Sequence, residues 1–413
     1  MKTFKTEPKL VKIKDTNRIM IKMLFFYKYE KEDMIKDIML DRILKTCNNK
    51  YRTPGEFETK KEDLFLLNLS VESEHYVDTA VKVVTISLPK EGIIDEFNID
   101  ESLKFVYETI YNPFVKNNEF DNEHFNWEKD FIIDREKNYP NNIYDYIDEK
   151  INNMINEIED TFITHDEYME YLQEQTPKTI YEHYKKTILD NNFITYIYGN
   201  VDEKVVEAFN KYFKPKEKEI KVNMKYYDIL KLTDYKEIEN KTKYNQSALN
   251  LLYQIKDFKF EERVKLDMLY FFLSARENDL IFQNLRVKNN LVYNASVLRS
   301  KVYGYLGITA YLDKEDILKA QKIIEGTLKD IQDENKFKIY KERLVRAFEY
   351  DMLADEDDDY KEIKEMIMKA VKSDYNLKEK FKVIKKITAK DMKKFIDRLV
   401  LTRKLTIIGD TNE

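Results

Sequence analysis

The chain has 413 residues, of which 43% are hydrophobic and 36% charged, and its 71 basic and 77 acidic side chains give a formal net charge of −6. This composition is globular rather than disordered, and the length exceeds what one core usually serves, so we expect two or three domains. No basic tract stands out, which argues against a nucleic-acid partner, and no apolar run is long enough to span a membrane.

Two features bear on the compartment. Residues 1–8 lack the apolar core of a signal peptide. Cys47 is the single cysteine, which excludes an internal disulfide framework and is typical of a reducing compartment. We therefore expect a cytoplasmic protein.

The first half of the chain predicts strands and helices in alternation. Alternating apolar residues predict a strand over 18–29, and near-helical spacing predicts a helix over 31–46. Thr53-Pro54-Gly55 is interpreted as a break. The remaining patterns predict strands at 63–72, 77–88 and 193–198, and helices at 101–112, 120–139, 144–158, 179–189 and 201–213.

The second half follows a charged connection over 215–243. It predicts strands at 247–253, 293–299, 304–311 and 405–408, and helices at 260–275, 315–334, 338–353, 360–371 and 380–399. The acidic run at 355–359 is interpreted as a solvated linker between helices.

The two halves repeat the same order of elements. Each closes on an apolar strand followed by glycine, and these glycines, Gly199 and Gly409, are 210 positions apart (409 − 199). We interpret this as an internal duplication of an α+β domain, with one copy in residues 1–214 and the other in 215–413. Each copy is expected to be an antiparallel-dominated sheet with helices packed on one face.

One stretch of the second half carries candidate chemistry. Leu285-Arg-Val-Lys-Asn-Asn-Leu-Val-Tyr293 places the guanidinium of Arg286 and the phenol of Tyr293 seven positions apart, at a predicted helix-to-strand junction. Such a pair can hold a carbonyl oxygen or an oxyanion, because Arg offers a fixed fork of donors and Tyr one O–H. The alternative is an exposed Arg at a helix end and a half-buried strand Tyr.

This stretch resembles the Leu-Arg-Glu-Lys-x-Gly-Leu-Ala-Tyr segment of the insulinase/pitrilysin-type zinc peptidases, the inverzincins. Asn112-Pro113 before a helix, and the segment Tyr196-Ile-Tyr-Gly-Asn-Val-Asp202, resemble two further segments of that family. The resemblance covers essentially the whole chain. It implies the two-domain fold that insulinase shares with mitochondrial processing peptidase.

The resemblance also implies where a metal site would lie. Active members carry H-x-x-E-H on the first long helix, where two His four apart bind zinc and the Glu activates the metal-bound water. Counting back from a segment that resembles the family's Lys-Tyr-Pro-Thr places the motif at 38–42, with Ile38 and Arg42 at the His positions and Asp41 at the Glu position. The third ligand would fall near Arg135. We therefore expect no metal on this chain.

The four histidines do not replace the motif. No two of them share a helix turn. His124 and Glu128 are four apart, but two ligands do not make a selective zinc site, and we interpret His124 and likewise His165 as surface residues near acids.

In bacterial two-chain members of the family, one subunit carries H-x-x-E-H and the other the Arg/Tyr pair. The resemblance thus implies the non-catalytic subunit of a heterodimeric zinc peptidase acting on peptides, with Arg286 binding a substrate carbonyl and Tyr293 donating to the oxyanion. Zinc is expected on the H-x-x-E-H partner, and the peptide is expected to add as a strand to a sheet edge. Two alternatives stay open: a catalytically silent scaffold of the same fold that binds peptide or protein, and an enzyme with unrelated chemistry built on Cys47 or the acidic clusters.

Overall fold

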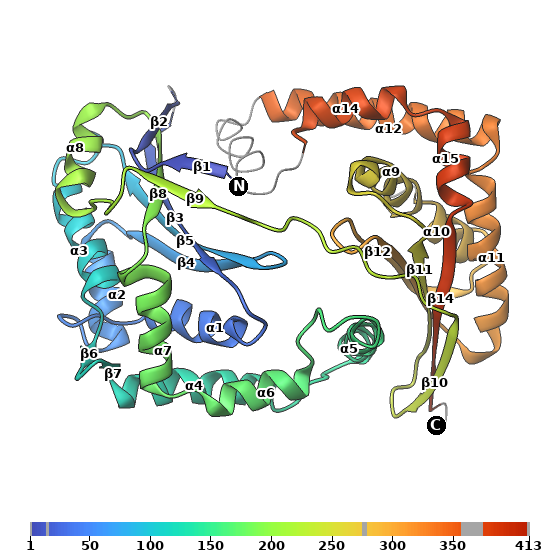
Figure 1. The fold of residues 1–413 in the computed structure, drawn as a ribbon, viewed down its shortest axis with the longest axis horizontal. Helices are drawn as coiled ribbons and strands as arrows, with labels where there is room; N and C mark the ends of the chain where they lie inside the picture. Colours follow the sequence, from blue (N-terminus) through green and yellow to red (C-terminus); the bar gives the residue numbers. More distant parts are fainter. Residues whose placement is uncertain (1, 14–15, 275–278, 357–374, 411–413) are drawn as a thin grey trace. The chain divides into compact units, whose positions relative to one another are not determined.

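The computed structural model describes residues 2–13, 16–274, 279–356 and 375–410. The chain divides into two compact units, and each is described by itself (Figure 1). Unit 1 holds Met1–Asn138 with Ile163–Lys225, and unit 2 holds Tyr139–Phe162 with most of the chain after Tyr226. Residues 139–162 thus lie in unit 2 although they come from the first half of the sequence. The boundary expected between the duplicated halves at residues 214 and 215 stays a prediction.

Unit 1 combines a mixed sheet, two short ribbons and seven α-helices within the described residues. Its strands are β1 (Lys2–Lys5), β2 (Lys9–Lys12), β3 (Arg18–Lys28), β4 (Asn68–His75), β5 (Thr79–Pro89), β6 (Val115–Lys116), β7 (Glu119–Phe120), β8 (Phe193–Gly199) and β9 (Glu219–Val222). Its helices are α1 (Asp33–Ile43), α2 (Pro54–Asp63), α3 (Ile99–Tyr111), α4 (Asn122–Glu136), α6 (His165–Glu174), α7 (Pro177–Tyr184), which continues as a wider π-type turn over Lys185–Leu189, and α8 (Glu203–Tyr212).

The five-stranded sheet of unit 1 has the order β2-β8-β3-β5-β4. The central strand β3 pairs antiparallel with β5 and β8, and β2 joins β8 in parallel. Because successive strand side chains point to opposite faces, Ile19, Ile21, Met23 and Phe25 of β3 all enter one core beneath the helices.

Unit 2 is built in the same way. Its strands are β10 (Lys236–Thr242), β11 (Ser247–Ile255), β12 (Val292–Ser300), β13 (Tyr305–Leu312) and β14 (Leu399–Gly409). Its helices are α5 (Ile143–Asn156), α9 (Arg263–Ser274), α10 (Leu280–Phe282), α11 (Ile317–Asp330), α12 (Glu334–Glu356), α14 (Leu377–Lys386) and α15 (Ala389–Ile396).

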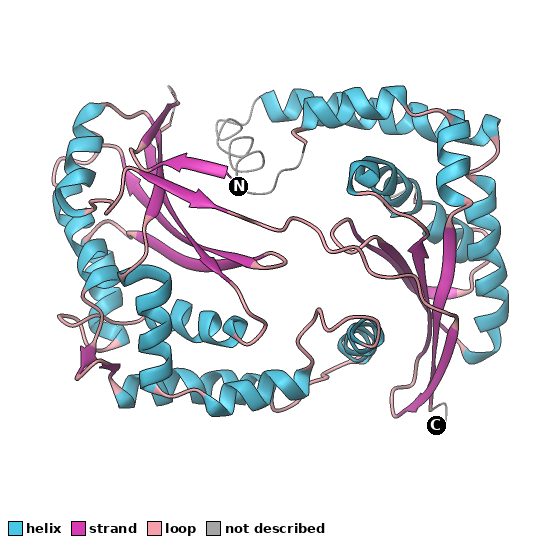
Figure 2. Cartoon of the chain, viewed as in Figure 1, coloured by secondary structure: helices cyan, strands magenta, loops and turns pink. Residues whose placement is uncertain are grey.

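The sheet of unit 2 has the order β10-β14-β11-β13-β12, which repeats that of unit 1 strand for strand. The central β11 pairs antiparallel with β13 and β14, and β10 joins β14 in parallel. Figure 2 shows the α+β architecture in both units. The predicted fold class, two α+β domains of antiparallel-dominated sheets with helices, is therefore confirmed.

The glycines that close the two halves meet the same steric demand. A Cβ on Gly199, at the end of β8, would lie 2.4 Å from the carbonyl oxygen of Arg18, and one on Gly409, at the end of β14, would lie 2.6 Å from that of Tyr244. In each unit the strand end therefore passes the neighbouring backbone too closely for any side chain. This explains why both halves end on Gly.

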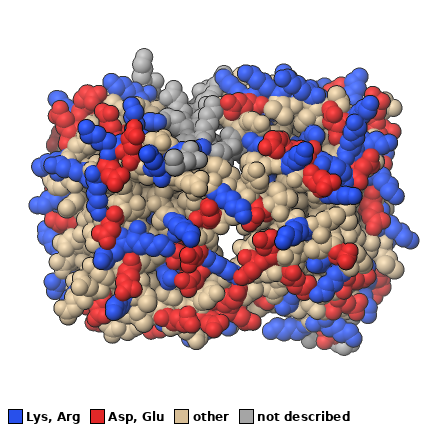
Figure 3. Space-filling view, in the orientation of Figure 1, with Lys and Arg blue, Asp and Glu red and all other residues tan. Residues whose placement is uncertain are grey.

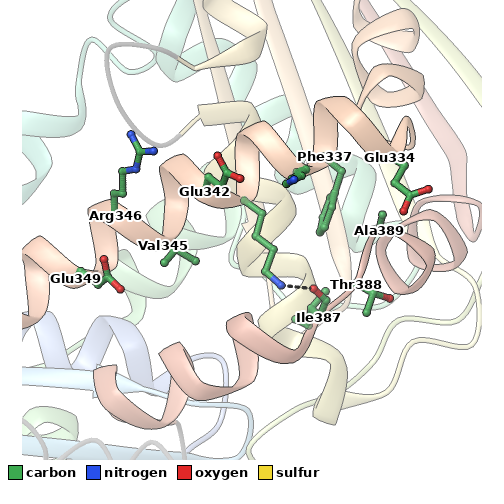
Figure 4. A pocket seen from close by; sticks show the side chains of 11 residues that line it. Glu334, Phe337, Glu342, Val345, Arg346, Glu349, Ile387, Thr388 and Ala389 are labelled. Carbon is green, nitrogen blue, oxygen red and sulfur yellow. Dashed lines mark hydrogen bonds between the residues drawn. The ribbon is translucent and has the colours of Figure 1, made fainter.

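In each unit a lysine on one helix donates hydrogen bonds to carbonyl oxygens at the end of another helix. In unit 1 the Lys129 ammonium donates to the carbonyl oxygens of Gln173 and Gln175 at 2.8 and 3.0 Å, at the end of α6. In unit 2 Lys341, at a corresponding place 212 positions later (341 − 129), donates to those of Lys385 and Ile387 at 2.8 and 2.7 Å, at the end of α14. Lys341 and Ile387 line a pocket of about 500 Å³. Figure 4 shows this pocket, with Ile387 in its wall.

The sheet of unit 2 is covered on both faces. One face packs on α9, α11, α12, α14 and α15. The other face packs on α5, whose buried Ile147, Ile151 and Ile155 contact Leu252 and Leu405 of the sheet in a separate cluster. The predicted helix over 144–158 is thus present, and it completes the core of the second sheet.

Several local predictions were wrong. Thr53-Pro54-Gly55 is no break but the start of α2, where Thr53 and Glu56 form a reciprocal capping box. Because α2 runs to Asp63, β4 begins five residues later than predicted. The helix α6 was missed, and the single helix predicted over 380–399 is two helices split at the capping residue Thr388. The predicted helix over 360–371 and most of the acidic run lie outside the described residues.

Candidate functional site

Arg286 lies in a π-type turn, Gln283–Val287, that follows α10 and precedes β12. The turn holds one extra residue, so the Lys288 N–H bonds back to the Gln283 carbonyl at 3.0 Å. Turns of this kind are frequent at functional sites. The Arg286 Nη1 donates to the Val292 carbonyl oxygen at 2.8 Å, and this is its one hydrogen bond to the described residues. The rest of the exposed guanidinium faces solvent.

Asn290 ends this turn with a positive φ of 49°. That conformation is disfavoured for most side chains, but Asn tolerates it better than nearly all others except Gly. The family segment that this stretch resembles has Gly here, so the departure at Asn290 preserves the backbone path. The chain can therefore reverse direction and enter β12 as the resemblance implies.

Tyr293 is placed by a β-bulge at the start of β12. The pairing with β13 shifts register between Val292 and Asn294, which leaves Tyr293 as the extra residue. Bulges aim a side chain out of its regular position and are common beside active sites. The side chain is 55% exposed, and β12 is the edge strand of its sheet. Its hydroxyl donates to the two carboxylate oxygens of Asp313, at 2.9 and 3.1 Å.

The charges around Tyr293 act in opposite directions. The hydrogen-bonded carboxylate of Asp313 raises the pKa of Tyr293, whereas the positive charge of Arg286 lowers it. The net effect is a raised pKa, so the phenol keeps its proton at neutral pH. Arg286 is thus close enough for its charge to act on the Tyr293 phenol, while the roles expected of the pair stay a prediction. The sequence analysis missed Asp313, because nothing in the spacing shows that it lies beside the bulge.

The three positions predicted for a degenerate metal motif lie on α1, and each has other contacts. Ile38 packs against the core of unit 1. The Asp41 carboxylate binds the buried Lys82 ammonium at 2.5 Å. Arg42 donates to Glu128 at 2.7 Å and stacks on the Phe131 ring at 4.0 Å.

A buried charge network lies one turn earlier on α1. Asp37 accepts hydrogen bonds from Tyr27 at 2.6 Å and from both His75 and His183 at 2.8 Å, and Lys82 lies 3.0 Å away. Burial alone would raise the pKa of Asp37, but the Lys82 ammonium and the two imidazoles hold it far below its usual range. Asp37 and Asp41 thus both bind a cation, and that cation is a side chain of this chain.

Arg135, expected near the position of a third ligand, does not join these groups. Its side chain is 55% exposed and pairs with Glu136 at 3.0 Å. Among the residues that the structure describes, no group of three or more His, Cys, Asp or Glu side chains is arranged to hold a metal ion.

The interpretation of His124 as a surface residue was wrong. His124 and Glu128 face α1, and both are buried. The Cys47 sulfur lies 3.0 Å from Nδ1 of His124, while Nε2 lies 2.7 Å from the Thr46 hydroxyl. Burial raises the pKa of Cys47 to about 12, so the thiol stays protonated at neutral pH. A Cys–His pair of this kind is a poor nucleophile, which disfavours the chemistry considered for Cys47.

Comparisons with known proteins agree with this fold. Residues 175–347 match the sequence profile of the family described as the peptidase M16 inactive domain. A structure from Enterococcus faecalis V583, described as a conserved protein, has a TM-score of 0.81 at 18% identity, with 98% of this chain and 96% of that one covered. A peptidase M16 inactive domain from Pseudomonas fluorescens has a TM-score of 0.71 at 12% identity, covering 99% and 98% of the two chains.

Residues 175–347 thus resemble the M16 inactive-domain family, and the solved structures show the fold of the chain. The resemblance to the insulinase/pitrilysin-type family is thereby confirmed, while the assignment to the two-chain type stays a prediction. The periplasmic protease PqqL from Escherichia coli matches with a TM-score of 0.64 at 9% identity, over 96% of this chain but 43% of PqqL. No curated protein sequence matches. Among the helices that the structure describes, none is long and apolar enough to cross a membrane.

Proposed function

We propose that this chain is the non-catalytic subunit of a heterodimeric zinc peptidase. It would form half of a substrate chamber and supply Arg286 and Tyr293 to an active site whose zinc is held by H-x-x-E-H on a homologous partner subunit. Arg286 would bind a carbonyl oxygen of the peptide, and Tyr293 would donate to the oxyanion that forms at the scissile carbonyl. Because a single cysteine is typical of a reducing compartment, we expect this assembly in the cytoplasm.

The observation that carries the proposal is the exposed Arg286/Tyr293 pair. A π-type turn and a bulge place the two side chains on one surface, at the start of an edge strand. Neither side chain is needed by the core of unit 2, and most of the Arg286 donors face solvent. This is the arrangement expected of groups that act on a molecule outside their own domain.

The share of PqqL that this chain covers supports a partner subunit. The chain spans 43% of PqqL and 89% of the solved first half of PqqL. The matched residues thus correspond to about one half of PqqL, and in the proposed assembly a homologous partner would supply the other half.

The charge distribution is compatible with a protein or peptide partner. On the face drawn in Figure 3, basic and acidic side chains are interspersed over both units, with no extended basic surface of the kind that nucleic acids select. The absence of a nucleic-acid partner remains part of the proposal.

The test is reconstitution with the partner. The chain would be co-purified from its source with an H-x-x-E-H homologue, and the complex screened for peptide cleavage. Tyr293→Phe should lower the rate by a factor of roughly 100–1000, the usual cost of one oxyanion donor, and Arg286→Ala should raise KM and lower the rate. Lys288→Ala, on the same turn, and Tyr235→Phe, which is similarly exposed, are the matched controls and should be neutral.

Assembly must be measured alongside activity. Size-exclusion chromatography should show that both variants still form the heterodimer, because their side chains are exposed. If Arg286→Ala and Tyr293→Phe cleave peptide at the normal rate, the pair has no catalytic role and the proposal fails.

A silent scaffold is the second candidate, and one observation favours it. The Tyr293 proton is already donated to Asp313, so the phenol has an acceptor without any substrate. A scaffold would bind peptide in the presence of the partner without any chelator-sensitive cleavage. Fluorescence anisotropy with a labelled peptide, run beside the cleavage screen, separates the two functions.

A further inference from the structure

Asp313 follows directly on β13 and sits at the N-terminal cap position of the short 3₁₀ turn Lys314–Asp316. An Asp at this position normally accepts a backbone N–H of the following turn. Here its side chain makes no capping hydrogen bond. Both of its oxygens accept from the Tyr293 hydroxyl instead. The carboxylate therefore has a partner that local backbone structure does not explain.

Strand register brings the two groups together. Val292, beside Tyr293, pairs with Leu312, beside Asp313. The phenol and the carboxylate thus lie at adjacent ends of two hydrogen-bonded strands, and the bulge at Tyr293 turns the ring toward Asp313. Their contact is fixed by the sheet rather than by a flexible loop.

We infer that Asp313 is a positioning residue for Tyr293, holding the ring of an exposed side chain where it can serve a peptide. The inference rests on the proposed function and deepens it. Without Asp313 the ring would rotate freely on the surface, and ordering it on each binding event would cost affinity and rate. When the peptide binds, the phenol passes its hydrogen bond from Asp313 to the substrate oxygen, and Asp313 returns to water.

The carboxylate has a second effect through charge. The groups that face the phenol are Asp313 and Asp316 from the segment after β13 and Arg286 from the turn before β12. Asp313 and Asp316 favour the neutral phenol and Arg286 favours the phenolate. Since only the neutral phenol can donate, Asp313 extends the donor form of Tyr293 to higher pH, opposite to the effect of Arg286.

The decisive variant is Asp313→Ala, with Glu315→Gln as the control that removes one negative charge from the same exposed segment. In the reconstituted complex Asp313→Ala should lower kcat/KM by roughly 3- to 10-fold, the cost of ordering one free side chain. The alkaline limb of its pH–rate profile should move to lower pH, because the phenol then ionises more readily beside Arg286. Asp313→Asn keeps an acceptor oxygen and should recover part of the rate while keeping the shifted limb.

A second measurement needs no partner. The isolated chain labelled with 3-fluorotyrosine gives a ¹⁹F resonance for Tyr293 that the Tyr293→Phe variant assigns. Its titration should move to lower pH in Asp313→Ala and stay in place in Glu315→Gln. An unchanged titration overturns the inference whatever the complex does.

The outcomes separate the inference from the function. If Tyr293→Phe abolishes cleavage but Asp313→Ala leaves the rate and the pH profile unchanged, the proposed function stands and the inference is wrong. If Tyr293→Phe itself has no effect on cleavage, the proposed function has failed, and the ¹⁹F titration alone decides whether Asp313 acts on the Tyr293 phenol.

Discussion

Lys82 carries an ammonium group with no exposure to solvent, held by the carboxylates of Asp37 and Asp41 on α1. Burial opposes its charge, yet these two carboxylates raise the pKa of Lys82 above its ordinary value. The stability of the folded state depends on both carboxylates that pair with this buried ammonium, because one unpaired charge in a core is strongly destabilising. Asp41, in the predicted degenerate metal motif, thus forms a structural ion pair that joins α1 to Lys82 on β5.

Acid should destabilise unit 1 through Asp37. Its folded-state pKa lies far below that of an unfolded Asp, so the stability it contributes is present above the unfolded value, near 4, and is lost progressively as the pH falls from there toward the folded-state pKa. Asp37→Asn should lower the melting temperature at pH 7 and flatten the decline toward pH 3, as measured by differential scanning fluorimetry.

The exposed Asp100 is the control for this experiment. It also pairs with a lysine, Lys211, at 2.7 Å, but solvent screens this pair. Asp100→Asn should therefore leave the pH profile close to that of the unchanged protein. A parallel acid decline in Asp37→Asn and the unchanged protein would exclude Asp37 as the responsible group.

At the scale of elements, the duplication is visible in contacts as well as in order. Lys129 and Lys341 each cap the end of a helix, α6 or α14, by donating to its last carbonyls, and burial lowers the pKa of both. Charged donors to otherwise unsatisfied carbonyls are among the stronger hydrogen bonds. The same contact at equivalent positions indicates that the two units descend from one ancestral domain.

The two lysines should therefore respond alike to mutation. Lys129→Met and Lys341→Met keep the side-chain volume and remove the donor, and each should cost about 1–3 kcal/mol of local stability. Hydrogen exchange should show faster exchange in the last turn of α6 for the first variant and of α14 for the second. Faster exchange in one helix alone would mean that the two contacts are not equivalent.

Elements were predicted well where apolar periodicity was strong and poorly where capping decided the boundary. The strands β3, β5, β8 and β11 were predicted correctly because apolar residues dominate the sequence of each. The start of α2 was missed because Thr53-Pro54-Gly55 was read as a turn, although Thr and Glu three apart with Pro between them is also a helix start. The bulge at Tyr293 and its contact with Asp313 could not be predicted, since they depend on the register between two strands.

At the scale of the whole molecule, metal should distinguish this chain from its proposed partner. Elemental analysis of the purified chain should find no stoichiometric zinc, since α1 offers Ile38 and Arg42 where a His pair would be required. A chelator should abolish cleavage by the heterodimer and leave the melting temperature of this chain alone unchanged. A full equivalent of zinc on the isolated chain would contradict the proposal that the zinc is held by the partner subunit.

The packing of α5 on the sheet of unit 2 determines when this unit can fold during synthesis. The helix leaves the ribosome with residues 143–156, but its partners Leu405 and Ile407 lie on β14, near the end of the chain. At ordinary rates of translation the apolar face of α5 waits on the order of tens of seconds for the strand that covers it. Unit 2 therefore completes its core only after β14 has left the ribosome, and a nascent chain stalled before β14 leaves the apolar face of α5 uncovered and open to aggregation.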